Sequence, residues 1–178
     1  MNPMPTLPDA CLAACQRWGI APTQHVLAVN VATQRVAWFT DGQLARSLPA
    51  STSRFGIGQQ EGSNATPLGL HRIVEKIGAG APAGTVFRAR QPVGHTSQPE
   101  FAGAKITTRI LWLEGLEPGF NRGGSVDSHA RYIYIHGTGD QRSIGKPASH
   151  GCIHLADDDL IPLFDLLPGG TLVWIAEK

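Results

Sequence analysis

The part of this 178-residue chain that decides its fold is a pair of short runs, YIYIHGT at residues 132–138 and SHGCIHL at residues 149–155. The first run alternates aromatic and β-branched residues, as a strand does, and reaches His136. A loop rich in Gly, Ser and Pro then leads to Cys152. We therefore expect a strand that ends at a histidine, followed by a tight turn that carries a cysteine.

Strand-like runs separated by turn residues fill most of the remaining chain. They are residues 25–31, 36–40, 43–51, 70–77, 85–90, 107–113, 131–135 and 171–176. Asp41-Gly42 is a strong turn signal between two of them. Short strands with frequent turns predict a mostly β, largely antiparallel sandwich or barrel, not alternating strands and helices.

Two helices are expected beside the strands. The first has Asp9 as a possible N-cap, runs over residues 10–18 and stops at Gly19. The second follows the acidic residues 157–159, and Pro168 ends it. Its apolar stripe is Leu160, Leu163, Phe164 and Leu167. Pro162 restricts how early this helix starts regularly, because an interior proline lacks a backbone donor.

Composition excludes several classes of protein. The 15 basic and 14 acidic residues nearly balance, so the chain has no strong field for nucleic acid or an anionic membrane. The three cysteines do not form a disulfide framework. Cys11 and Cys15 are four residues apart, which predicts two reduced, buried thiols on one helical face.

The first ten residues carry no basic segment and no unbroken apolar run follows them, so they do not resemble a secretory signal. No window is long and apolar enough to span a bilayer. We therefore expect a cytoplasmic protein, or a periplasmic one if the natural chain starts further upstream.

Cys152 and His136 are the candidates for chemistry. A thiol attacks a carbonyl when a base takes its proton, and His136 can be that base. The carbonyl of Gly137 can orient the other nitrogen of the imidazole. The amides of Gly151 and Cys152 lie on a tight turn and are candidate oxyanion donors. Together these groups predict acyl transfer through a thioester.

Three stretches of the chain resemble the L,D-transpeptidase (YkuD-type) catalytic domain. They are TPLG at residues 66–69, the 132–138 strand, and SIGKPASHGC at residues 143–152. The resemblance covers roughly residues 24–176 and divides the chain into an N-terminal helical extension, 1–23, and a catalytic domain, 24–178. It implies a β-sandwich with a few short helices and a cleft under a flap. It also implies peptidoglycan stem peptides as substrates, carbapenem-type inhibitors, Cys152 as nucleophile and His136 as base.

Further residues are expected to contact the substrate, although each also has a structural interpretation. Ser149 and His150 flank the cysteine, and Arg122 and Arg131 lie near the motifs. The loop at 121–124 is the expected substrate-contacting loop, and Arg142 and Lys146 are further candidate cations. Family members commonly carry Arg or Asn where this chain has His154, and an imidazole lacks the two-pronged carboxylate grip of arginine. His154 therefore contacts substrate or only hydrogen-bonds within its loop.

The resemblance implies cleavage between the third stem residue and the terminal D-Ala. Water as acceptor gives an L,D-carboxypeptidase, whereas an amine of another stem gives a cross-linking transpeptidase. The expected cytoplasmic location favours hydrolysis in muropeptide recycling, and residues 78–103 form a possible cap over the site. We expect no cofactor. Two alternatives are a zinc site at His136, His150, Cys152 and His154, and a peptidoglycan-binding module without activity, which the presence of Cys152 disfavours.

Overall fold

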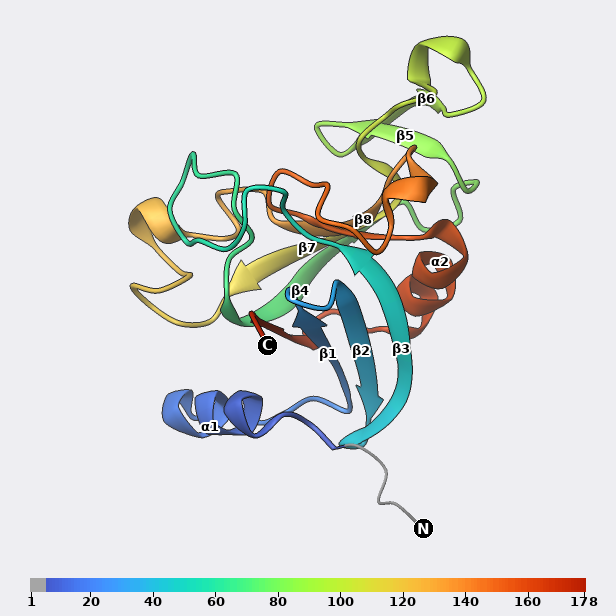
Figure 1. Cartoon of the computed structure of the whole chain (residues 1–178). Helices are drawn as coiled ribbons and strands as arrows, with labels where there is room; N and C mark the ends of the chain where they lie inside the picture. The colour runs from blue at the N-terminus through green and yellow to red at the C-terminus, as the bar shows by residue number, and fades with distance from the viewer. Residues whose placement is uncertain (1–5) are drawn as a thin grey trace.

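The computed structural model describes residues 6–178 and is mostly β, as predicted (Figure 1). Its helices are α1 (Asp9–Trp18) and α2 (Asp157–Leu166), with 3-10 turns at Pro99–Phe101, Gly124–Val126 and Gln141–Ser143. Its strands are β1 (His25–Asn30), β2 (Arg35–Thr40), β3 (Gln43–Ser51), β4 (Gly69–Ile77), β5 (Thr85–Arg88), β6 (Gln91–His95), β7 (Thr107–Gly115), β8 (Tyr134–Gly137), β9 (Ile153–Leu155) and β10 (Leu172–Ala176). None of the helices in residues 6–178 has the length and apolar character that a membrane span requires.

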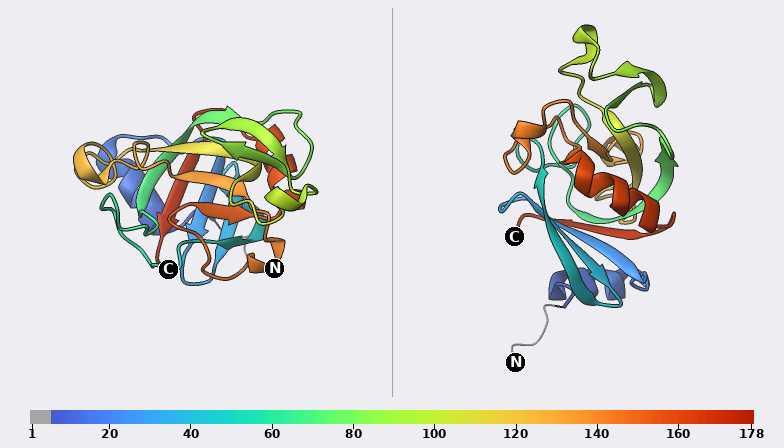
Figure 2. Two further views of the ribbon diagram at one scale, coloured as in Figure 1. Left: turned by 90° about the horizontal axis from the view of Figure 1, so that it is seen from above. Right: turned by 90° about the vertical axis from the view of Figure 1, so that its right-hand side faces the viewer.

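The strands form one continuous sheet that closes on itself. The order is β4-β10-β1-β2-β3-β9-β8-β7-β5-β6, and β4 also pairs with β7. Most neighbours are antiparallel, as expected, but β1–β10 and β8–β9 are parallel. The closed sheet is flattened into two layers, with β1, β2, β3 and β10 on one side and β7 and β8 on the other (Figures 1 and 2). The β5–β6 hairpin projects beyond β7 at one end.

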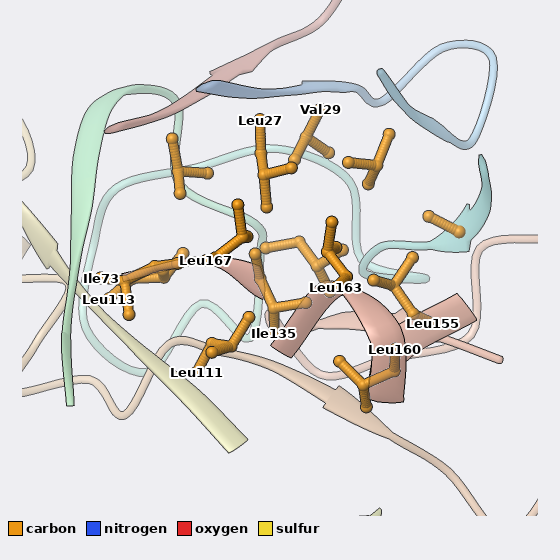
Figure 3. Close-up of a cluster of buried hydrophobic side chains, with 14 of the residues drawn as sticks. Leu27, Val29, Ile73, Leu111, Leu113, Ile135, Leu155, Leu160, Leu163 and Leu167 are labelled. Atoms are coloured by element: carbon orange, nitrogen blue, oxygen red, sulfur yellow. The ribbon is translucent and has the colours of Figure 1, made fainter. Parts of the chain in front are cut away.

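The main core lies between these layers and is completed by α2. The apolar stripe predicted for this helix is buried against residues of both layers (Figure 3). Leu27 of β1 and Ile135 of β8, for example, are fully buried in the same cluster. Burying a side chain of this size stabilises the fold by roughly 1.5–3 kcal/mol. The core therefore fixes β8 and β9, which position the candidate site.

The helix α1 covers the outer face of β1 and its neighbours. Cys11 and Cys15 are buried there against Val26, Phe39 and Leu172, and both are free thiols, as predicted. The predicted N-cap is wrong: α1 already includes Asp9, and Pro8 precedes it without a side-chain cap. The predicted stop is correct, because Gly19 adopts a left-handed conformation. Residues 1–5 of the predicted extension lie outside the described residues.

Several predicted element boundaries are wrong for local reasons. The strand predicted at 131–135 begins only at Tyr134, because the amides of Arg131 and Tyr132 bond within a turn and Tyr132 has a φ of +56°. The strand predicted at 85–90 ends at Arg88, since Ala89 and Arg90 form a positive-φ turn into the unpredicted β6. The helix α2 begins five residues before Pro162 and retains it inside, where only one backbone donor is lost.

Candidate active site

The site is built on two neighbouring parallel strands. In their register Ile135 of β8 lies opposite Ile153 of β9, and His136 lies opposite His154. Successive side chains of a strand point to opposite faces. The two isoleucines are fully buried in the main core. The two imidazoles therefore point away from the core, and their ring centroids are 4.6 Å apart with planes tilted by 52°.

Both histidines and Cys152 line one cavity of about 270 Å³. The other lining residues come from three segments. They are Gly103, Lys105, Ile106, Thr138, Asp140, Ser143, Ala148, Ser149 and His150. The structure thus brings the predicted nucleophile and the predicted base to the same pocket. Gly103 is the end of the predicted cap segment, and it is the part of that segment that reaches the pocket wall.

Cys152 is held by backbone groups of the chain that leads into β8. Its thiol donates to the carbonyl of Tyr132, and the amide of Tyr134 donates to Sγ, each at 3.3 Å. Burial raises the pKa of the thiol to about 11, although the amide of Tyr134 and the charge of Arg131 oppose this shift. Within residues 6–178 no hydrogen bond joins Sγ to His136. The resting thiol is therefore protonated and must move its proton when it reacts.

His136 has the hydrogen bond that a general base requires. Its Nδ1 lies 2.6 Å from the carbonyl oxygen of Gly137. Because that oxygen only accepts, Nδ1 carries the proton and Nε2 is left as the acceptor. Burial lowers the pKa of His136 to about 3, and neighbouring His154 adds to the effect. The imidazole is therefore neutral at physiological pH and able to receive a proton.

The turn before Cys152 is tightly constrained. Gly151 has φ +122°, and a Cβ there would lie 3.2 Å from the carbonyl oxygen of Ala65. Its own carbonyl accepts a hydrogen bond from the hydroxyl of Thr66 at 3.0 Å. Its amide donates to Ser149 Oγ at 3.2 Å, so it is not free to bind an oxyanion. The Cys152 amide has no partner within residues 6–178 and is the better donor of the two predicted ones.

The residues predicted to bind substrate have different environments in the structure. Ser149 is buried and bonds to its own turn, and His154 lines the pocket. His150 is exposed, with Nε2 3.1 Å from Arg54 Nη2. It lines both the pocket and an adjoining cleft of about 200 Å³. Slight desolvation of the ring, followed by the charges of the nearby cations Lys105 and Arg54, lowers its pKa.

The predicted arginines do not line the 270 Å³ pocket. Arg131 is partly buried and donates to the carbonyls of Gly58, Gln59 and Ala65, so it fixes that loop and lines the adjoining cleft. Arg122 is exposed and pairs with Glu114 at 3.6 Å. The loop at 121–124 does not border the pocket either. The prediction for Arg122 thus finds no support in this arrangement.

Sequence reasoning missed the cation that does line the pocket. Lys105 lies just before β7 and is exposed at the pocket wall. Asp140, also in the wall, pairs with exposed Arg142 at 3.9 Å. No local motif marks Lys105, because only the path of the chain from the β5–β6 hairpin brings it there. Among residues 6–178 no group of three or more His, Cys, Asp or Glu side chains is arranged to hold a metal ion, so the zinc alternative has no ligand set there.

Comparison with known proteins gives matches both in sequence and in fold. A family model described as the L,D-transpeptidase catalytic domain (YkuD) matches residues 24–175. The Bacillus subtilis protein YqjB, whose name assigns it to the L,D-transpeptidases, is 43% identical over 47 residues, which are 26% of this chain and 27% of that protein. Salmonella typhimurium ErfK/SrfK, with a name of the same kind, is 46% identical over 48 residues, 27% of this chain and 16% of that protein.

Solved structures show the same fold. L,D-transpeptidase 3 from Mycobacterium tuberculosis, in complex with a faropenem-derived adduct, superposes with a TM-score of 0.55 at 15% identity. That superposition covers 86% of this chain and 60% of the other. An L,D-transpeptidase from Mycobacterium smegmatis gives a TM-score of 0.51 at 18% identity, with 86% and 58% covered. The predicted β-sandwich fold is thereby confirmed. The chain spans about a quarter or less of the curated relatives' length in these matches, and under two thirds of the solved chains.

Proposed function

Because this chain belongs to the L,D-transpeptidase catalytic domain family, we propose that it is a cysteine acyl-enzyme that removes the terminal D-Ala from peptidoglycan stem peptides by hydrolysis. The observation that carries the proposal is the shared pocket of Cys152 and His136, with Nδ1 of the imidazole oriented by Gly137. A thiol and an oriented neutral base in one cavity are the groups that thioester chemistry needs.

The first half-reaction forms the acyl-enzyme. Sγ of Cys152 attacks the carbonyl carbon of the bond before D-Ala while its proton passes to Nε2 of His136. The developing oxyanion is stabilised by the Cys152 amide. His136 then returns the proton to the leaving nitrogen, the C–N bond breaks, and D-Ala departs as a free amino acid. A thioester remains on Cys152, and His136 is neutral again.

The shape and charge of the pocket support a short substrate with a free carboxylate. The cavity is small, and its lining includes apolar Ile106 and Ala148 beside the reacting groups. Lys105 is the residue of its lining that carries an ammonium group, and no salt bridge to it is found within residues 6–178. An ammonium group at this place attracts the C-terminal carboxylate of D-Ala. In the second half-reaction water attacks the thioester and releases the shortened peptide.

One observation favours cross-linking as a second candidate. The cleft of about 200 Å³ adjoins the pocket through His150 and carries the carboxylate of Glu61 beside Tyr132 and Arg131. A carboxylate at this position attracts the amine of a second stem peptide. If such an amine attacks the thioester in place of water, the product is a cross-linked dimer and the enzyme is a transpeptidase.

The products formed from purified tetrapeptide separate the two candidates. The peptide is incubated with the protein, with and without an excess of a second stem that carries a free amine, and products are identified by mass spectrometry. The proposal predicts tripeptide and D-Ala under both conditions. Dimer as the main product would overturn hydrolysis and leave cross-linking. The Cys152→Ala variant is the matched control and should release no D-Ala.

We also propose a location, a domain division and an inhibitor class for this protein. We place the protein in the cytoplasm, where soluble muropeptides are its substrates, and fractionation of cells that express the full-length natural protein tests this location. The family match begins at residue 24, which supports the division into an extension at 1–23 and a catalytic domain. Carbapenems are expected to acylate Cys152, because an L,D-transpeptidase of the same fold is known in complex with the carbapenem imipenem.

A further inference from the structure

His154 lies beside His136 and faces the same pocket from the neighbouring strand. The two residues are register partners, and their rings are 4.6 Å apart. His154 is only 8% exposed, yet it lines the cavity with Cys152. The first half-reaction needs one base, and Gly137 orients His136 for that role. His154 therefore has no role in the formation of the acyl-enzyme.

The hydrogen bonds of His154 differ from those of His136. Its Nδ1 is enclosed by protein and has no partner among residues 6–178. A buried N–H without an acceptor is rarer in native structures than a buried acceptor without a donor. The proton of the neutral ring is thus placed on Nε2, the nitrogen that is not enclosed. His154 offers a donor where His136 offers an acceptor.

We propose that His154 and His136 together hold the water molecule that hydrolyses the acyl-enzyme, and that His154 thereby directs the thioester towards hydrolysis. This inference rests on the proposed function. The Nε2–H of His154 donates to the water oxygen, and one water proton is donated to Nε2 of His136. A ring nitrogen that donates and another that accepts, on rings whose centroids are 4.6 Å apart, give a bound water two polar partners.

The step balances without any further reactant. The water oxygen attacks the thioester carbonyl carbon while its proton passes to Nε2 of His136. The C–S bond then breaks, the shortened peptide leaves as a carboxylic acid that ionises in solution, and the proton on His136 returns to Sγ. His154 donates a hydrogen bond throughout and keeps its proton. It is therefore a positioning residue for water and not a second base.

Replacing His154 separates this role from a purely structural one. His154→Leu removes the donor, whereas His154→Gln keeps an amide N–H. Single-turnover reactions with tetrapeptide measure the first release of D-Ala and the decay of the acyl-enzyme by intact mass. For His154→Leu we expect D-Ala release within about 3-fold of wild type and thioester hydrolysis slowed by about 10- to 100-fold. His154→Gln should recover part of the hydrolysis rate.

Partition between water and an added amine provides an independent readout. With a fixed excess of hydroxylamine, the ratio of hydroxamate to tripeptide should rise in His154→Leu by about the factor by which hydrolysis falls. His25→Leu, the same change at a histidine of β1 that does not line the pocket, is the matched control and should leave the ratio unchanged. Thermal unfolding followed by circular dichroism verifies that all variants are folded.

Each failure has a distinct meaning. Unchanged hydrolysis and partition in a folded His154→Leu variant, with tripeptide produced by the wild type, would overturn this inference alone. Loss of the first D-Ala release in both folded His154 variants would also overturn it, because His154 would then act before the thioester exists. If the wild type forms no tripeptide, the proposed function and this inference both fall.

Discussion

Burial acts in opposite directions on the two groups that exchange a proton in the pocket. It raises the pKa of Cys152 to about 11 and lowers that of His136 to about 3. A thiolate–imidazolium pair is therefore disfavoured at rest, and both groups are neutral over a broad range of pH. The thiol becomes nucleophilic only as its proton is transferred, so the position of His136 matters more than its charge.

This charge state predicts an unusual pH profile for acylation. Acylation by a carbapenem should be nearly constant between about pH 5 and pH 9, and it should fall as His136 gains a proton near pH 3. Stopped-flow absorbance measures this rate. A bell-shaped profile centred between about pH 6 and pH 8 would indicate a preformed ion pair and would contradict the neutral resting state.

The His136→Asn variant tests the assignment of the base. At neutral pH its acylation rate should fall by about 100- to 10,000-fold, because no group is left to take the thiol proton. The remaining rate should rise tenfold per pH unit, as the fraction of thiolate rises towards the pKa of Cys152 at about 11. A pH-independent residual rate would show that another residue receives the proton.

At the scale of elements, the turn that carries Cys152 depends on a hydroxyl group from a loop distant in sequence, that of Thr66. The Thr66 hydroxyl accepts a hydrogen bond from the amide of Ser53 at 3.0 Å and donates one to the carbonyl of Gly151 at 3.0 Å. It is fully buried. This residue belongs to the TPLG run at 66–69, and its contacts explain why that run accompanies the cysteine motif in one site.

Thr66→Val should therefore weaken both the fold and the chemistry. Loss of the buried hydroxyl leaves two groups unpaired and should lower the free energy of unfolding by about 1–3 kcal/mol in urea denaturation. Acylation of the folded protein should slow as well, because the turn at Gly151 loses its support. Thr171→Val is the control, since Thr171 is equally buried but donates to Pro168 instead. Equal acylation rates in the two variants would refute the coupling.

The helices and strands were predicted best where a periodic pattern ran over many residues and Gly or another turn residue stood at its end. β3 has its predicted ends, and α1 ends at Gly19 as expected. β9 escaped prediction because three residues carry too little pattern, although this strand places His154 beside His136. β6 escaped because the turn at Ala89 and Arg90 has positive φ without the Gly or Asn that usually marks it.

For the molecule as a whole, three buried histidines couple stability to pH. Burial lowers the pKa of His71 to about 4, of His136 to about 3 and of His154 to about 4. An unfolded histidine titrates near 6.5. Between these values the unfolded chain binds more protons than the folded one, so acidification favours unfolding.

We therefore expect the free energy of unfolding to be constant above about pH 7.5 and to fall as pH drops through about 6.5 towards about 4. The slope approaches roughly 1.4 kcal/mol per pH unit for each of the three histidines. Urea denaturation at several pH values measures it. His71 lies away from the pocket. The His71→Gln variant removes one of the three titrating groups and should lower the slope by roughly 1.4 kcal/mol per pH unit. A stability that is flat across this range would contradict the buried, neutral state of these imidazoles.

The site was predictable in part, because its reacting residues lie in two short motifs. The wall of the pocket was not, since Lys105 reaches it only through the closure of the sheet by β7. The hydrogen bond that occupies the Gly151 amide also depends on the folded turn. The sequence predicts that Arg131 contacts substrate, but in the fold its guanidinium donates to carbonyls of the loop at 58–65. Such assignments need tertiary structure.

The central claim, that Cys152 is the acylated nucleophile, is tested most directly by intact-mass measurement after incubation with a carbapenem, followed by peptide mapping. The account predicts one adduct per chain on the wild type, located on the peptide that contains Cys152, and no adduct on Cys152→Ala. The buried thiols of Cys11 and Cys15 remain in that variant and control for nonspecific reaction. An equal adduct on Cys152→Ala, or one that maps to Cys11 or Cys15, would contradict it.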